Sequence, residues 1–113
     1  QFGWFYKNAG AKSHPVGTKS ANAFGLRDMH GNLYEWCHDV YDEKWYERPA
    51  TSDPRGPISG ANRVIRGGTW PYPASYCRSA ARYFNTPSSR SAYYGFRCVQ
   101  VLDLPTTKVR AAD

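Results

Sequence analysis

Two carboxylates flank a Gly-Asn pair in the segment 22–36, whose sequence is NAFGLRDMHGNLYEW. Glycine lets the backbone turn sharply, and calcium takes about six to eight oxygen ligands, some of them carbonyls of a bent loop. The spacing is therefore compatible with a calcium site that uses the carboxylates of Asp28 and Glu35 and the carbonyls of Gly31 and Leu33. A plain surface turn has the same composition and is the commoner origin of such a loop.

Three side chains of the same region have the types that bind transition metals, namely His30, Glu35 and His38. Their positions do not form a usual ligand spacing. If the segment is a strand, neighbouring residues such as Cys37 and His38 point to opposite faces. The pattern therefore favours His30 as a hydrogen-bonded loop histidine.

The thiol of Cys77 is the one weak catalytic candidate. A nucleophilic thiol needs a nearby base or positive field, which Arg78 and Arg97 would provide. Buried thiols at Cys77 and Cys98, beside aromatic residues, are the favoured alternative. With Cys37 the chain has three cysteines and no C-x-x-C spacing, so neither a zinc site nor a thioredoxin-like motif is indicated. The odd number allows one disulfide or three thiols; a periplasmic or extracellular location is favoured over a cytoplasmic one.

Aromatic residues in three nearby loops form the candidate ligand-binding surface. They alternate with Ser, Asn, Pro and Ala, a mixture typical of recognition surfaces, in which rigid rings supply contact area and small polar residues adapt. Packing in the hydrophobic core is an equally weighted alternative role for these rings. The residues are Trp70, Tyr72, Tyr76, Tyr83, Phe84, Tyr93 and Tyr94.

The net charge of +6 and the pI of about 9.4 raise the question of nucleic-acid binding. The basic residues form no consecutive run and no helical stripe, so we expect no nucleic-acid partner. Arginines placed singly among apolar residues are instead expected to fix loops by bonds to carbonyls and carboxylates. No apolar run is long enough to span a membrane. The arginines concerned are Arg63, Arg66, Arg78, Arg82, Arg90 and Arg97.

The elements that must position these residues are short. The chain has 113 residues, 16% of them aromatic, which predicts one domain with a small core of rings and an α+β, largely irregular fold. Such a core is expected to need a metal, a disulfide or a partner chain. We expect Trp45 and Tyr46 to anchor a long excursion over 42–62. The predicted strands are 33–41, 63–70 and 94–102, with an aromatic segment at 1–7, a strand or helical turn at 77–83 and a mobile tail at 105–113.

Three stretches together resemble the formylglycine-generating enzyme, or sulfatase-modifying factor, family: 22–36, the RVIRGGTW segment at 63–70, and 77–98 with its CRSAAR, NTP and GFRC pieces. The resemblance implies a C-type lectin-like fold, with residues 1–104 as the C-terminal part of such a domain. It also implies a calcium ion held by Asp28, Gly31, Leu33 and Glu35. A second calcium site and the N-terminal strands have no counterpart, so a second chain supplying the N-terminal part is an expected partner.

Family enzymes use O2 and a copper ion held by two cysteines that follow the Gly-Gly motif. Here Tyr72 occupies the position of the first cysteine, Cys77 does not align with the second, and Tyr34 replaces a Trp. Because linear copper coordination needs two soft ligands, copper is not expected. We predict a non-catalytic, calcium-stabilised binding or accessory module that presents aromatic loops to a protein or other ligand. The alternative is an O2-dependent oxidoreductase of the formylglycine-generating type, acting on a cysteine-containing substrate with unusual metal ligands.

Overall fold

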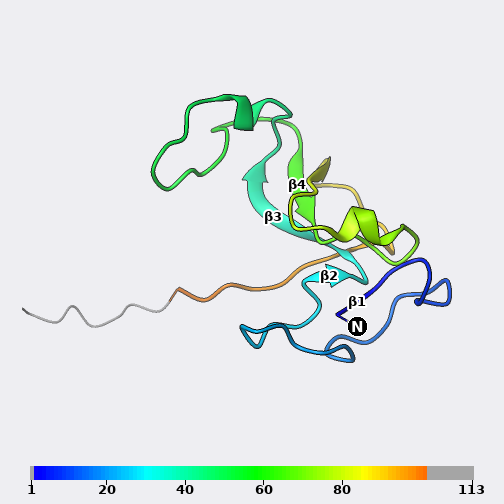
Figure 1. Ribbon diagram of the computed structural model, residues 1–113. Helices are drawn as coiled ribbons and strands as arrows, with labels where there is room; N and C mark the ends of the chain where they lie inside the picture. Colours follow the sequence, from blue (N-terminus) through cyan, green and yellow to red (C-terminus); the bar gives the residue numbers. More distant parts are fainter. Residues whose placement is uncertain (1, 102–113) are drawn as a thin grey trace, which may run out of the picture.

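The computed structural model describes residues 2–101 of the 113-residue chain. Short strands and two 3-10 turns are joined by long irregular loops (Figure 1). The tail expected at 105–113 lies outside the described residues. No helix among residues 2–101 has the length and apolar character needed to cross a membrane.

The larger sheet has four strands in the order β5-β4-β3-β6. Its centre is an antiparallel pair, with Trp36 opposite Ile65 and Glu35 opposite Arg66. Val64 and Ile65 form the buried middle of this sheet, as β-branched side chains on a pleated surface commonly do. The pairing register shifts between Trp36 and Val40. The strands are β3 (Tyr34–Val40), β4 (Arg63–Arg66), β5 (Tyr83–Asn85) and β6 (Tyr94–Gly95).

A second, two-stranded parallel sheet pairs β1 (Gly3–Trp4) with β2 (His30–Gly31). Both strands need glycine, because a Cβ on Gly3 would collide with the carbonyl of His30 and one on Gly31 with the carbonyl of Trp4. The next residue, Asn32, is 5% exposed and its amide bonds the backbone N–H and carbonyl of His14. The Gly-Asn pair thus joins the N-terminal segment to the start of β3.

The predicted strands at 33–41 and 63–70 are confirmed as β3 and β4, but β4 stops at Arg66. Gly67 and Gly68 have φ of 91° and 78°, in the left-handed region that ends a strand. The segment 77–83, expected to be one strand or one turn, is divided between the 3-10 turn η2 (Ala74–Cys77) and the start of β5.

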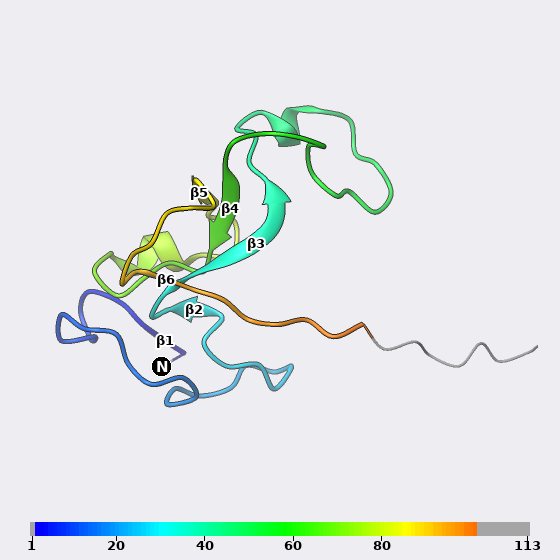
Figure 2. The same cartoon turned by 180° about the vertical axis from the view of Figure 1, so that it is seen from behind.

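The closing strand expected over 94–102 was predicted too long. β6 contains only Tyr94–Gly95 and lies parallel to β3. After β6 the chain runs away from the sheet (Figure 2), and Phe96 and Val99 are 79% and 86% exposed. Apolar side chains alone did not make a strand here, because no partner strand is present among the described residues beyond β6.

The excursion over 42–62 projects beyond the sheet, on the side away from β1 and β2 (Figure 1). It carries the 3-10 turn η1 (Trp45–Glu47). Tyr46, expected to anchor it, is 69% exposed, so burial is not what holds it. The ring lies 4.6 Å from the guanidinium of Arg82, and its hydroxyl accepts a hydrogen bond from Arg66. The anchoring is therefore by arginine contacts rather than by core packing.

Candidate functional site

All four residues expected to hold calcium line one cavity of about 310 Å³ between β2 and the start of β3. Asp28 stands on the loop before β2 with φ of 58°, and its Oδ2 accepts a hydrogen bond from the backbone N–H of Gly17 at 2.7 Å. Its Oδ1 is buried and has no hydrogen-bond partner. A buried carboxylate oxygen without a donor or cation costs free energy, which a bound cation would offset. The residues present therefore fit a calcium ion held by Asp28, Glu35 and the carbonyls of Gly31 and Leu33.

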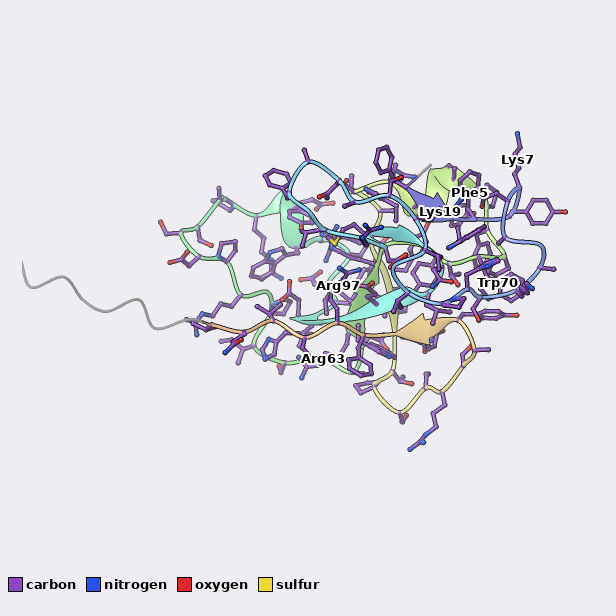
Figure 3. All side chains as sticks on the ribbon, turned by 90° about the horizontal axis from the view of Figure 1, so that it is seen from below. Phe5, Lys7, Lys19, Arg63, Trp70 and Arg97 are labelled. Carbon is purple, nitrogen blue, oxygen red and sulfur yellow. The ribbon has the colours of Figure 1, made fainter. Side chains whose placement is uncertain are left out.

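Arg97, which the sequence predicted to fix loops by bonds to carbonyls and carboxylates, does so in this cavity. Its guanidinium forms a two-pronged ion pair with Glu35, with Nη2 at 2.6 Å from Oε1. The same Nη2 donates to the carbonyl oxygens of Arg27 at 3.1 Å and Asp28 at 3.0 Å. The bond to Glu35 raises the pKa of Arg97, so its charge is permanent. Arg97 therefore ties the loop after β6 to the candidate calcium site, near the middle of the molecule (Figure 3).

Cys77, the weak catalytic candidate, is a packed core residue. It is 6% exposed, and Gly68 lies against it so closely that an added Cβ would be 2.6 Å from Sγ. Burial raises the pKa of its thiol, which disfavours the thiolate needed for nucleophilic attack or metal binding. The carbonyl of Cys77 bonds Nδ1 of His30 at 2.6 Å, so His30 is a hydrogen-bonded histidine as expected.

The three cysteines form no disulfide; Cys37 is half-buried and Cys98 exposed. Burial also raises the pKa of Cys37. Within residues 2–101, no three His, Cys, Asp or Glu side chains are grouped closely enough to hold a metal ion. The expected calcium site is consistent with this, since two of its four ligands are backbone carbonyls.

Three of the seven candidate ligand-binding residues form a stack. Tyr76 lies between Tyr72 and Tyr83, with ring centroids 5.1 Å and 5.6 Å apart and nearly parallel planes. Tyr34, on β3, packs against the rings of Tyr72 and Tyr83 from the buried side. We call these four residues the tyrosine cluster. Burial and the neighbouring phenols raise the pKa of Tyr34, so its hydroxyl is neutral.

The other four candidates make ring contacts outside this stack. Trp70 and Tyr93 meet edge to face, and Tyr94 meets Trp36 in the same way. Phe84 stacks on Tyr41 at 4.3 Å. The tyrosine cluster is consequently the one group that combines several of these rings with partial exposure, 42% at Tyr72 and 37% at Tyr76.

Comparison with known proteins gives the relationship of the whole chain. The model of the sulfatase-modifying factor enzyme 1-like domain matches residues 1–102. A formylglycine-generating enzyme of Streptomyces coelicolor is 45% identical over 93 residues, which are 80% of this chain and 30% of that protein. A protein of the same name from Thermomonospora curvata is 47% identical over 90 residues, 74% of this chain and 30% of its own. The serine/threonine-protein kinase pkn1 of Chlamydia caviae is 44% identical, with 76% of this chain and 14% of that protein covered.

Two solved structures contain the same fold over most of this chain. Treponema denticola variable protein 1 superposes with a TM-score of 0.72 at 37% identity, covering 84% of this chain and 34% of that one. PvdO from Pseudomonas aeruginosa gives 0.71 at 32% identity, covering 83% and 37%. These neighbours confirm the expected C-type lectin-like, largely irregular α+β fold. The chain spans about a third of these two structures and of the formylglycine-generating enzymes compared above. This chain belongs to the sulfatase-modifying factor, or formylglycine-generating enzyme, family.

Proposed function

We propose that this chain is a non-catalytic, calcium-stabilised binding or accessory module that presents the tyrosine cluster to a protein ligand. The observation that carries the proposal is that the segment after Gly67 and Gly68 lacks two thiols available to bind copper. Tyr72 stands where family enzymes have a copper-binding cysteine, and its ring is stacked on Tyr76. The remaining thiol, Cys77, is buried with a raised pKa. These residues do not fit a two-thiolate copper site.

Calcium has a structural role in this proposal. A cation bound by Asp28 and Glu35 would connect the loop before β2 to the first residues of β3, the strand that begins at Tyr34. The described core is small, with Val40, Val64 and Ile65 as its buried aliphatic side chains. A domain with so little buried apolar surface gains a large fraction of its stability from one bound ion.

Binding by the tyrosine cluster follows from the properties of the side chain. A tyrosine offers a rigid apolar body and a hydroxyl that both donates and accepts, with little conformational entropy to lose. Tyr72 and Tyr76 are exposed and stacked on each other, and the buried ring of Tyr34 packs against Tyr72. The cluster is thus ordered before a ligand arrives, which lowers the entropic cost of association.

A second chain that supplies the rest of the family fold is part of the proposal. Exposed apolar side chains support it, because they gather where β1 and the loop before β2 meet. Phe2, Leu26 and Met29 are 49%, 47% and 38% exposed and line one cavity of about 200 Å³. Phe24, in the same loop, is 87% exposed. Large exposed apolar patches of this kind mark interaction surfaces.

One observation favours the alternative, an O2-dependent oxidoreductase acting on a cysteine-containing substrate. The relatives named formylglycine-generating enzyme are 45% and 47% identical to this chain. In that alternative the metal ligands would have to be unusual, and Cys77 would be the thiol of this segment that takes part.

The test combines binding and turnover on the same preparation. Immobilised chain is exposed to a displayed library of random peptides, and the selected peptides are measured against the wild type, Tyr76→Ala and Tyr93→Ala. We expect selected peptides to lose binding with Tyr76→Ala and to keep it with Tyr93→Ala, which lies outside the cluster. In parallel, a cysteine-containing sulfatase-type peptide is incubated with the chain, Cu(I) and O2. Formylglycine in the product would overturn the proposal.

A further inference from the structure

Acidic residues are confined to one part of the described chain. Residues 2–27 and 54–101 contain no Asp or Glu, and every described carboxylate side chain lies between Asp28 and Asp53. The second acid-free segment carries many cations and no lysine. They are Arg55, Arg63, Arg66, Arg78, Arg82, Arg90 and Arg97.

Few of these charges are compensated. Among residues 2–101 the ion pairs are Arg48 with Asp42 and Arg97 with Glu35. The guanidinium of Arg78 donates to the carbonyl of Ser75 at 2.7 Å, which fixes its position without neutralising it. The acid-free segments therefore present fixed positive charge to the surrounding water.

Three of the four rings of the tyrosine cluster come from these acid-free segments. Tyr72, Tyr76 and Tyr83 come from 54–101, and the backbone N–H of Tyr6 bonds the carbonyl of Tyr72 at 3.0 Å. The fourth ring, Tyr34, has Glu35 beside it in sequence. Neighbouring strand residues point to opposite faces, and Glu35 is paired with Arg97 at the calcium site.

Two cations belong to the segments that form the stack or bond to it. Arg78 is exposed, and its charge acts on the hydroxyl of Tyr83 against the effect of burial, which raises the pKa of that hydroxyl. Lys7 follows Tyr6, whose backbone is bonded to Tyr72. It projects outward at the end of the molecule where Phe5 and Trp70 lie (Figure 3). Phenol O–H groups and both cations are donors, so carboxylates are the complementary acceptors.

We infer that the tyrosine cluster, with Arg78, binds an acidic peptide segment of a partner protein. This rests on the proposed binding function and specifies its ligand. Stacking within the cluster already uses both faces of the Tyr76 ring. At Tyr76 the hydroxyl and the ring edge are therefore what a ligand meets, which suits a carboxylate-bearing chain. A nucleic acid would need open ring faces for its bases and a larger set of phosphate contacts.

The experiment measures fluorescence anisotropy of four labelled probes with the full chain. They are a peptide of alternating Glu and Gly, matched Lys-Gly and Ser-Gly peptides, and oligo(dT). We expect the Glu-Gly peptide to bind most tightly and its affinity to fall as salt is raised.

Three variants separate charge, hydroxyl and background. Arg78→Gln removes one charge, and Tyr76→Phe removes one hydroxyl while keeping the stacked ring. Each should weaken Glu-Gly binding about threefold to tenfold. Arg90 is an exposed arginine of the loop after β5, and Arg90→Gln is the matched control. This substitution should change the affinity for the Glu-Gly peptide less than about twofold. Thermal melting of each variant verifies folding.

Distinct results separate failure of this inference from failure of the proposed function. Equal binding of all three peptides, lost with Tyr76→Ala, would overturn the acidic specificity and leave a binding module. Tighter binding of oligo(dT) than of the Glu-Gly peptide would overturn the inference in favour of a nucleic-acid surface. Binding of none of the probes would overturn it as well, and formylglycine formation by the same preparation would overturn the proposed function itself.

Discussion

Replacing Gly68 by alanine tests whether Cys77 is a packed core residue. Gly68 has φ of 78°, and an added Cβ would lie 2.6 Å from Sγ and 2.9 Å from Cα of Cys77. Holding an L-residue in the left-handed region costs about 1–2 kcal/mol. Overpacking against a buried backbone that cannot easily move adds about 1–3 kcal/mol. We therefore expect Gly68→Ala to lower the free energy of unfolding by about 2–5 kcal/mol, a large part of a small domain's stability.

The matched control is Gly25→Ala. Gly25 has nearly the same φ, 77°, but no atom lies within 4 Å of its added Cβ. It carries the conformational cost alone, so the difference between the two variants isolates the contact with Cys77. Urea denaturation followed by tryptophan fluorescence gives both values. Equal destabilisation by the two substitutions would refute the packed position of Cys77 and would mean that its thiol is accessible for chemistry.

Four further predictions concern the candidate calcium site and the thiols. Chelation should lower the melting temperature by about 10 °C or more, relative to the value measured with calcium at about 100 times its Kd. The double variant Asp28→Ala, Glu35→Ala should abolish this dependence on calcium. Identical melting temperatures with calcium and with chelator would count against the site. Arg97→Met removes a cation beside the site, so calorimetry should show calcium binding about threefold to tenfold tighter, while weaker binding would mean that Arg97 mainly positions Glu35. Burial raises the pKa of Cys77, so iodoacetamide should label exposed Cys98 well before it. The same raised pKa stabilises the folded state below the thiol's ordinary pKa of about 8.5, and stability should fall as pH rises above it, less steeply in Cys77→Ala.

The local pattern of the sequence was sufficient for the two central strands. Alternation over 33–41 and the Val-Ile pair at 64–65 predicted β3 and β4, because a strand with one buried face imposes a period of two. These features depend on neighbours in the chain, and the sequence contains that information.

Features that depend on distant neighbours were not predictable in the same way. Tyr34 was noted only as a departure from the family pattern, yet its buried ring packs against those of Tyr72 and Tyr83. Arg97 was correctly expected to bond carbonyls and carboxylates, but the sequence did not show that its partner is Glu35, in a segment far apart in the chain. Which rings stack, and which arginine meets which carboxylate, is decided by tertiary packing.

The resemblance contributed what composition alone left open. Asp28, Gly31, Leu33 and Glu35 were a minority interpretation as a calcium loop until the family motif assigned them roles. The structure brings the four residues to one cavity and leaves Oδ1 of Asp28 without a partner. Binding of the ion itself stays a prediction.

Mass spectrometry of a cysteine-containing sulfatase-type peptide, after incubation with this chain, Cu(I) and O2, tests the non-catalytic assignment most directly. Because the family resemblance places Tyr72 at the position of a copper ligand and Cys77 is buried against Gly68, we expect the peptide's cysteine to be recovered unchanged at every time point. Conversion of that cysteine to formylglycine, in amounts exceeding those of a control without the chain, would contradict the assignment.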